Sequence, residues 1–359
     1  MAAAPWYADC PCSWIGETQW PSPRIKAEKL YLGDTGLSSE PTRDVPRVAV
    51  TPQTLGLAGG EWCPYGTGGE GPEFPGDQRF DDGASICFDG AALRSDLEIL
   101  GATKVALDLS VNRPTAFVCV RLNDVKPDGS STRVAYAVMN LTHRNGHHRT
   151  QKLIPGRQYR VNFQLSDAAY SFIRGHRLRI AISTTYWPMI WPSPEPVELT
   201  LHTHNSSIEL PVRPRRGGPK LAPFLSAEEG PPMSATILSA GASENRVSRD
   251  VLSGRVEVLS ERGGDRVLIE EHGLEAGRRK TVERMSITEG DPLSAETEMT
   301  VGNQIKRDGF DVEVKARTHL TSTEDDFLLT ADLDVYAVSY THLRAHETDS
   351  YLVCRLLLE

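Results

Sequence analysis

The sequence lacks several features that would each place it in a functional class. Its 359 residues contain no run of 18 apolar residues, so we expect no helix that crosses a membrane. The 39 Lys and Arg are outnumbered by 48 Asp and Glu, and this net charge of −9 argues against a nucleic-acid groove. The start, MAAAPWYADCPC, has neither the charged beginning nor the apolar core of a signal peptide. We therefore predict a cytoplasmic protein without membrane or nucleic-acid partners.

Paired cysteine motifs are also missing. The closest pair, Cys10 and Cys12, is separated by a single residue, and the next cysteine is Cys63. Zinc sites built from cysteine use C-x2-4-C spacing, so this arrangement predicts no metal site. Cys87 and Cys119 lie inside apolar runs typical of buried strands, where free thiols are common, and Cys354 is isolated near the end. We expect reduced cysteines and no cofactor.

The nucleophile elbow of α/β-hydrolases, G-x-S-x-G, does not occur. The two nearest matches are GASIC at Gly83–Cys87 and GASEN at Gly241–Asn245, and both lack the second glycine. The chain also lacks the alternation of strands and helices that builds the parallel sheet beneath such an elbow. The sequence therefore predicts no catalytic residue of its own.

What the chain has instead is alternation of apolar and polar residues with period two. KVALDLSV places Val105, Leu107 and Leu109 on one face, and Pro127-Asp128-Gly129 predicts a hairpin between two long strands. Nine or ten such strands up to about residue 212 predict an all-β fold, a jelly-roll or galactose-binding-like β-sandwich. The only helix expected is a short one near DGAALRSDLEIL, residues 89–100.

A segment rich in Pro, Gly and Arg separates this region from a second set of strands. In the second set, Val312, Val314 and Ala316 share one face and charged residues the other, which predicts a smaller antiparallel β meander that packs on the first domain. The last residues break the pattern and resemble translated adapter sequence. The expected division is a linker remnant at 1–25, the sandwich at 26–213, a linker at 214–233, the additional β region at 234–337 and a non-native tail at 338–359.

Four segments carry a resemblance to a known family: WPSPRIKAEKLYLGDTGLS, GEWCPYGTGGEGPEFPGDQRFDDGASICFD, the stretch from LRSDLEILG to NLTHR, and AYSFIRGHRLRIAISTTYWPMIWPSPEPVELTL. In this order they resemble the C-terminal part of X-Pro dipeptidyl-peptidases and CocE/NonD (cocaine-esterase-like) hydrolases. The resemblance runs from about Trp20 to Val212. It implies the non-catalytic jelly roll of a serine hydrolase whose Ser, Asp and His triad lies upstream. The partner implied is therefore an α/β-hydrolase catalytic domain, normally in the same polypeptide, and a homo-oligomer is a further possibility.

The candidate site residues follow from two unusual segments. In YWPMIWPSP, two tryptophans precede proline, which favours a stiff extended ribbon that displays Tyr186, Trp187 and Trp191. These rings either cap the core of their own domain or pack against the catalytic domain. The second segment, DQRFDDG, reads as a solvated polar loop; the resemblance places it near the catalytic domain, so Asp77 and Arg79 are candidates for the border of the substrate cleft.

Two other functions remain open. The first is an autonomous hydrolase or metal-dependent enzyme that uses His143, with Asp124 and Asp128 upstream, or the pair His202 and His204 on one strand face. His143 is better explained as a residue at a strand end that bonds neighbouring backbone, and the pair lacks an evident third ligand. The second is a carbohydrate-binding module with tryptophans as stacking platforms.

Overall fold

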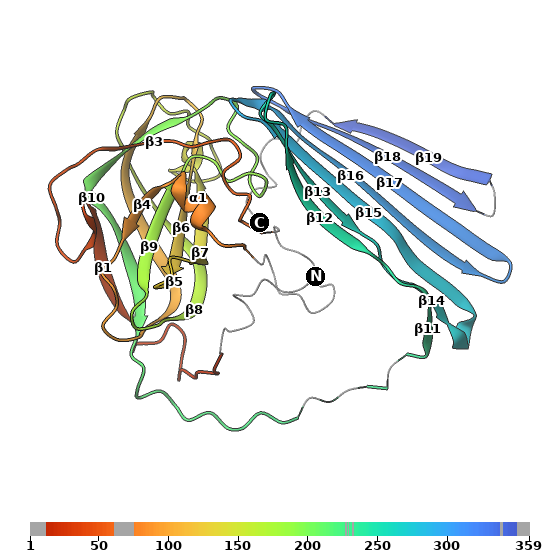
Figure 1. Ribbon diagram of the computed structural model, residues 1–359, viewed down its shortest axis with the longest axis horizontal. Coiled ribbons are helices and arrows are strands. Elements are labelled where there is room, and N and C mark those ends of the chain that lie inside the picture. Colours follow the sequence, from red (N-terminus) through yellow and green to blue (C-terminus); the bar gives the residue numbers. More distant parts are fainter. Residues whose placement is uncertain are drawn as a thin grey trace. The chain divides into compact units, whose positions relative to one another are not determined.

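The computed structural model describes residues 12–60, 75–226, 228, 230, 231, 233–337 and 340–349, the last ten and residues 278 and 279 by their backbone only. The chain divides into two compact units between Pro223 and Phe224, inside the segment 214–233. Antiparallel strands make up nearly all regular structure in both units, which confirms the all-β prediction (Figure 1).

The first unit contains a larger and a smaller sheet. The larger has the order β2-β1-β10-β5-β8, and β3 pairs with the beginning of β10. Its strands are β1 (Lys26–Gly33), β2 (Gly36–Ser38), β3 (Arg47–Val50), β5 (Leu97–Val111), β8 (Tyr159–Phe172) and β10 (Glu198–Arg213).

The smaller sheet has the order β4-β9-β6-β7. It consists of β4 (Ile86–Asp89), β9 (Arg177–Ser183), β6 (Phe117–Val125) and β7 (Ser131–Asn140). Strands β6 and β7 form the predicted hairpin, whose turn is closed by hydrogen bonds between Lys126 and Ser130 (2.9 Å) and between Gly129 and Lys126 (2.9 Å). Gly129 has φ +87°, a conformation that favours glycine and explains this residue in the turn.

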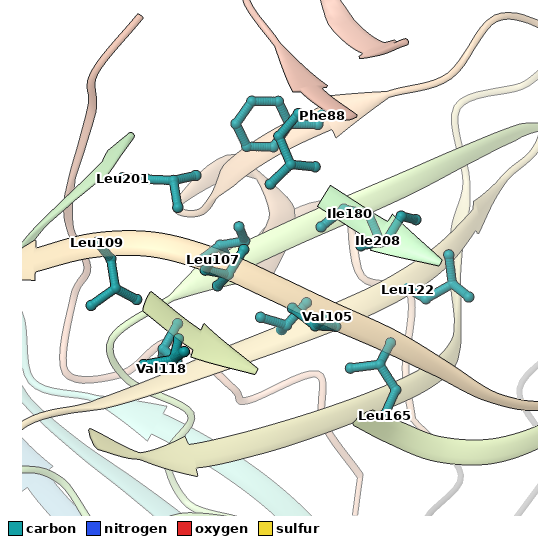
Figure 2. Close-up of a cluster of buried hydrophobic side chains, with 14 of the residues drawn as sticks. Phe88, Val105, Leu107, Leu109, Val118, Leu122, Leu165, Ile180, Leu201 and Ile208 are labelled. Carbon is teal, nitrogen blue, oxygen red and sulfur yellow. The ribbon is translucent and has the colours of Figure 1, made fainter. Parts of the chain in front are cut away.

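The two sheets pack face to face around one apolar core. Val105, Leu107 and Leu109 of β5 point into it and are at most 1% exposed, as the alternation predicted. Val118 and Leu122 of β6 meet them from the smaller sheet (Figure 2). Each large aliphatic side chain buried in this way contributes about 1.5–3 kcal/mol, so the core is the main source of stability. This confirms the predicted β-sandwich.

The helix expected at residues 89–100 is wrong. Leu97 already begins strand β5, and Ile99 is 1% exposed in the sandwich core. Before it, Leu93 exchanges backbone hydrogen bonds of 2.9 and 2.8 Å with His176 and Gly175. Tertiary pairing therefore overrides the local helical preference of this stretch. The helix of this region is instead α1 (Arg79–Gly83), and a 3₁₀ turn, η1, spans Leu141–His143.

The second unit is one antiparallel sheet. Its main path has the order β11-β14-β15-β16-β17-β18-β19, and β12 and β13 join it alongside β15. The bounds are β11 (Ala235–Ser239), β12 (Ser243–Arg249), β13 (Arg255–Arg262), β14 (Arg266–Ile269), the 3₁₀ turn η2 (Glu270–His272), β15 (Leu274–Thr288), β16 (Asp291–Arg307), β17 (Phe310–Ser322), β18 (Phe327–Ala337) and β19 (Tyr340–Asp349).

From β15 to β19 each strand pairs with the next, as expected for a meander. The uninterrupted register places Val312, Val314 and Ala316 opposite Ala337, Val335 and Leu333, so apolar residues do share one face. Residues 340–349 form a strand rather than a helix. That residues 338–359 are a non-native tail stays a prediction, as does the packing of this sheet on the sandwich.

Candidate functional site

The outer face of the smaller sheet is covered, although an outer face of a sandwich usually meets water. All nine residues of β6 are buried, both those that point into the core and those that point away from it. The outward set includes Cys119, Arg121 and Asn123, each 0% exposed. They are covered from outside by α1 and the segments around Leu55 and Tyr186.

Arg121 is the centre of a buried polar network. Its guanidinium donates hydrogen bonds to Gln78 Oε1 (2.9 Å) and Ser85 Oγ (2.8 Å), and its Nη1 lies 3.3 Å from Asp82 Oδ1. Gln78 is likewise 0% exposed. A buried charge is tolerated only when it is paired and hydrogen-bonded. Arg121 meets this condition through Nη1 and Nη2, which contact residues of α1 and its flanks, whereas its buried Nε has no hydrogen-bond partner among the described residues.

Asp82 connects three strands to the helix. Its carboxylate accepts hydrogen bonds from Asn123 Nδ2 (2.9 Å), Ser131 Oγ (2.7 Å) and Arg179 Nη1 (3.1 Å). Arg179 also makes a bidentate pair with Asp89, at 2.6 and 2.7 Å. The interpretation of DQRFDDG as a solvated loop is therefore wrong for Asp81 and Asp82, because both are buried and the guanidinium groups of Arg121 and Arg179 contact Asp82.

Asp81 holds the preceding loop in place. Its Oδ1 accepts a hydrogen bond from the backbone N–H of Gly56 (3.1 Å), while its Oδ2 lies 4.0 Å from Arg121 Nη1. Burial raises the pKa of Asp81, although Arg121 and the backbone donors oppose the shift. The carboxyl group thus ties α1 to the loop at Gly56.

Tyr186 and Trp187 cap the core of their own unit. Tyr186 is 0% exposed in a small apolar cluster with Leu55 and Phe117, and its hydroxyl accepts a hydrogen bond from Arg133. Burial raises the pKa of this tyrosine well above its usual value. Trp187 is 2% exposed. Of the two positions that the sequence left open, these two rings occupy the one inside their own domain.

The remaining candidate residues reach the surface. Arg79 donates from Nε to Asp77 Oδ2 (2.8 Å), and its side chain is 61% exposed. Burial opposes ionisation of Asp77, but hydrogen bonds from Arg79 and Ser131 lower its pKa. Trp191 is partly exposed. Sequence reasoning missed Phe80. This residue is 69% exposed on α1, whereas the other side of the helix is buried.

The histidines that were candidates for catalysis or metal binding have other roles. His143 lies in η1 and is 7% exposed, with its Nδ1 3.2 Å from Nδ1 of His147. On β10, His202 Nδ1 lies 3.4 Å from Asp44 Oδ2, and His204 Nδ1 lies 2.8 Å from a backbone carbonyl oxygen. Over the described ranges, no group of three or more His, Cys, Asp or Glu side chains could hold a metal ion.

The two aspartates upstream of His143 do not pair with it. Asp124 binds His176 Nδ1 (2.9 Å) and the hydroxyl of Tyr170 (2.9 Å), and this contact was not anticipated from the sequence. Asp128 accepts hydrogen bonds from Ser130 within the hairpin turn. The first contact joins the end of β6 to the turn before β9, and the second stabilises a turn.

Cys87 and Cys119 are poor nucleophiles. Burial raises the pKa of both Cys87 and Cys119 to about 12, so each is protonated at neutral pH. Cys87 and Cys119 are free and Cys12 is exposed, whereas Cys10, Cys63 and Cys354 lie outside the described residues. In the part of the chain that the structure describes, no helix is long and apolar enough to span a membrane.

Known proteins are similar to about half of this chain. Cocaine esterase from Rhodococcus sp. (strain MB1 Bresler) is 23% identical over 189 residues, which cover 49% of this chain and 32% of the esterase. An aminopeptidase from the marine sediment archaeon Thaumarchaeota archaeon aligns with TM-score 0.49 and 17% identity, over 55% of this chain and 38% of its own. An alpha-amino acid ester hydrolase aligns with TM-score 0.44 and 22% identity, over 52% and 36%. The chain thus spans about a third of the length of the curated relative it matches.

The family model named X-Pro dipeptidyl-peptidase C-terminal non-catalytic domain matches residues 4–247. This range includes both sheets of the sandwich, the covering helix α1 and the buried network around Arg121. The chain belongs to the family of X-Pro dipeptidyl-peptidase C-terminal non-catalytic domains.

Proposed function

We propose that the sandwich of this chain is the accessory module of a serine hydrolase of the X-Pro dipeptidyl-peptidase and cocaine-esterase type. It packs on an α/β-hydrolase catalytic domain and shapes the entrance to that domain's substrate cleft. The match of residues 4–247 to the non-catalytic family domain carries this proposal. The catalytic domain supplies the serine nucleophile, and the reaction is hydrolysis of an ester or amide, or release of X-Pro dipeptides, through an acyl-enzyme.

The surface that we assign to this contact is the exposed side of α1. Phe80 offers a large apolar side chain, and the ion pair between Arg79 and Asp77 stands beside it. Asp82 anchors the helix to the sheet and Asp81 anchors it to the loop at Gly56, so the surface is ordered before a partner arrives. A preorganised surface loses little conformational entropy on binding, which favours its use as a docking site.

Association in trans tests the proposal. The full chain is co-expressed with the α/β-hydrolase domain of a close homologue from which its own C-terminal module has been removed. We expect the two to co-purify and the hydrolase domain to regain activity on an activated ester. Lack of association between the wild-type chain and the hydrolase domain, with no recovery of activity, would count against the module function.

Two variants locate the contact. Phe80→Glu places a charge at the centre of the assigned surface and should weaken association by at least about ten-fold, because an unpaired charge would be desolvated at the interface. Ile154→Glu is the matched control, because Ile154 lies outside α1 and is 56% exposed, compared with 69% for Phe80. This variant should leave association unchanged. Equal weakening by both variants would argue that α1 is not the docking surface.

The alternative functions have less support in the described residues. A carbohydrate platform needs an exposed ring, and Trp187 is 2% exposed. An autonomous hydrolase needs a nucleophile within about 3 Å of its base, and His143 faces another imidazole instead. A fluorophosphonate probe separates the cases: we expect no covalent labelling of the chain alone, and stoichiometric labelling would establish the autonomous enzyme.

A further inference from the structure

On strands β16 to β18 the second unit has a sheet face without charge, and the residues that pair with this face on β15 and β19 include Glu283, Glu347 and Asp349. Strands β16, β17 and β18 pair without a register shift, so residues directly opposite one another share a face and alternate with those of the other face. Within these three strands, five consecutive cross-strand rows contain no charged residue: Ile305-Val312-Ala337, Asn303-Val314-Val335, Val301-Ala316-Leu333, Met299-Thr318-Ala331 and Thr297-Leu320-Leu329. We call these fifteen residues the uncharged patch.

The opposite face of the same strands carries the charges. Arg317 donates to Glu298 (2.7 Å), and Lys315 lies 3.5 Å from Glu313. Further charged or polar residues occupy the rows between them, among them Lys306, Asp311, Asp332 and Asp334. The strands are therefore two-sided: one face is suited to water, and the other is suited to contact with another surface.

The uncharged patch is not buried as a core would be. None of its fifteen residues is fully buried: Asn303 and Ile305, the latter 47% exposed, reach the surface, and the other thirteen are half-buried. In the sandwich, by contrast, Leu107 and Leu109 are 0% exposed. Single apolar residues on a surface need no explanation, but a contiguous, largely apolar patch that is not fully buried indicates an interaction surface.

We propose that the uncharged patch is a homodimer interface, in which two copies of this chain pack their β16–β18 faces together. Three strands about 4.8 Å apart and five rows about 6.8 Å apart give a face of about 500 Å². Two such faces bury about 1,000 Å², the level at which specific interfaces begin. The geometry is that of a two-layer β-sandwich, with sheets about 10 Å apart.

A second copy suits this face better than a charged or unrelated partner. A twofold interface is self-complementary, and a patch without charge meets itself without repulsion. The patch also lies outside residues 4–247, the range that matches the non-catalytic family domain, so it is not part of the surface assigned above to a hydrolase domain. The inference is therefore independent of the proposed function.

Sedimentation equilibrium of the full chain from about 1 to 200 μM tests the dimer. At this interface size we expect reversible dimerisation in the micromolar range. Val314→Lys, at the middle of the patch, should raise the dimer dissociation constant by at least ten-fold. Thr330→Lys adds the same charge on the opposite face of β18 and should leave the dissociation constant unchanged.

Loss of folding in Val314→Lys is separated from loss of association by a second variant. The double substitution Val314→Thr and Val335→Thr keeps side-chain shape and strand propensity, and it should also raise the dissociation constant while the circular dichroism spectrum is retained. A monomer at every concentration would overturn the proposal and would favour the packing expected from the sequence, in which this face covers the sandwich of the same chain. A dimer that both patch variants leave intact would also overturn it. Association with a hydrolase domain is measured separately, so failure of one proposal leaves the other standing.

Discussion

Arg121 on β6 and Asp82 on α1 are fully enclosed, with the guanidinium Nη1 3.3 Å from the carboxylate Oδ1. The two residues are far apart in the chain, and their contact fixes the short helix on the outer face of the sheet. It also explains why a segment rich in acidic residues is inside the protein. An ion pair in this position is costly to break, because the remaining partner stays buried without compensation.

Replacement of Arg121 by methionine should therefore destabilise the first unit by about 3–5 kcal/mol. All six tryptophans precede residue 224, so tryptophan fluorescence during urea unfolding reports on this unit. Arg113→Met is the matched control, because Arg113 pairs with Glu195 at 3.1 Å on the surface, with both side chains about 40% exposed. It should cost less than about 1 kcal/mol. Equal effects would contradict the role assigned to the buried pair.

Gly56 lies against the backbone of Tyr186 and Trp187, so a side chain at this position should destabilise the first unit. Gly56 has φ +119°, and a Cβ atom there would lie 2.6 Å from the Trp187 carbonyl oxygen. Gly156 has φ +77° with no atom within 4 Å of its Cβ position. Gly156→Ala should cost about 1–2 kcal/mol from backbone conformation alone. Gly56→Ala should cost about 1–3 kcal/mol more, because Trp187 must shift; urea unfolding measures both.

His143 should make the stability of the first unit depend on pH. Burial, together with the neighbouring His147, lowers the pKa of His143 below its usual value of about 6.5. The unfolded chain therefore binds a proton that the folded chain resists, and unfolding becomes easier as the pH falls through about 6.5. His143→Gln should reduce the loss of unfolding free energy between pH 7.5 and 5. An unchanged pH profile in this variant would contradict the assignment.

The buried thiols should resist alkylation in the folded protein. With a pKa of about 12, Cys119 and Cys87 exist as thiolate in about one molecule in 10,000 at pH 8. Iodoacetamide treatment followed by peptide mass mapping should show labelling of exposed Cys12 long before either of them. Addition of urea should abolish the difference. Early labelling of Cys119 in native conditions would show that β6 is accessible from its outer face.

Much of the architecture could be predicted because strand alternation is a local property. The apolar side chains at Val105, Leu107 and Leu109 specify one buried face whatever lies opposite them. The hairpin at Gly129 follows from the turn residues themselves. The helix predicted at residues 89–100 failed for the opposite reason: the state of that stretch depends on backbone partners more than 70 residues away.

The candidate site could be predicted only in part. The segment with Asp77 and Arg79 was identified, but its polar composition suggested a solvated loop, whereas Asp81 and Asp82 are buried. Their burial depends on Arg121 and Arg179, which no local pattern connects to them. An exposed Phe80 next to two buried acids could have been suspected from its position within DQRFDD, since one apolar residue among charges on a short helix often marks a contact.

The sequence by itself determined the strand content, the two-sided character of the strands and the resemblance to a non-catalytic family domain, because each is written in consecutive residues. Only the tertiary structure decided that Tyr186 and Trp187 fill their own core, that the acidic helix is anchored from inside, and that a sheet face of fifteen residues carries no charge. Those outcomes depend on which strands lie side by side. Strands far apart in the chain could pair in several ways that fit the local sequence equally well, and only the tertiary structure shows which pairing forms.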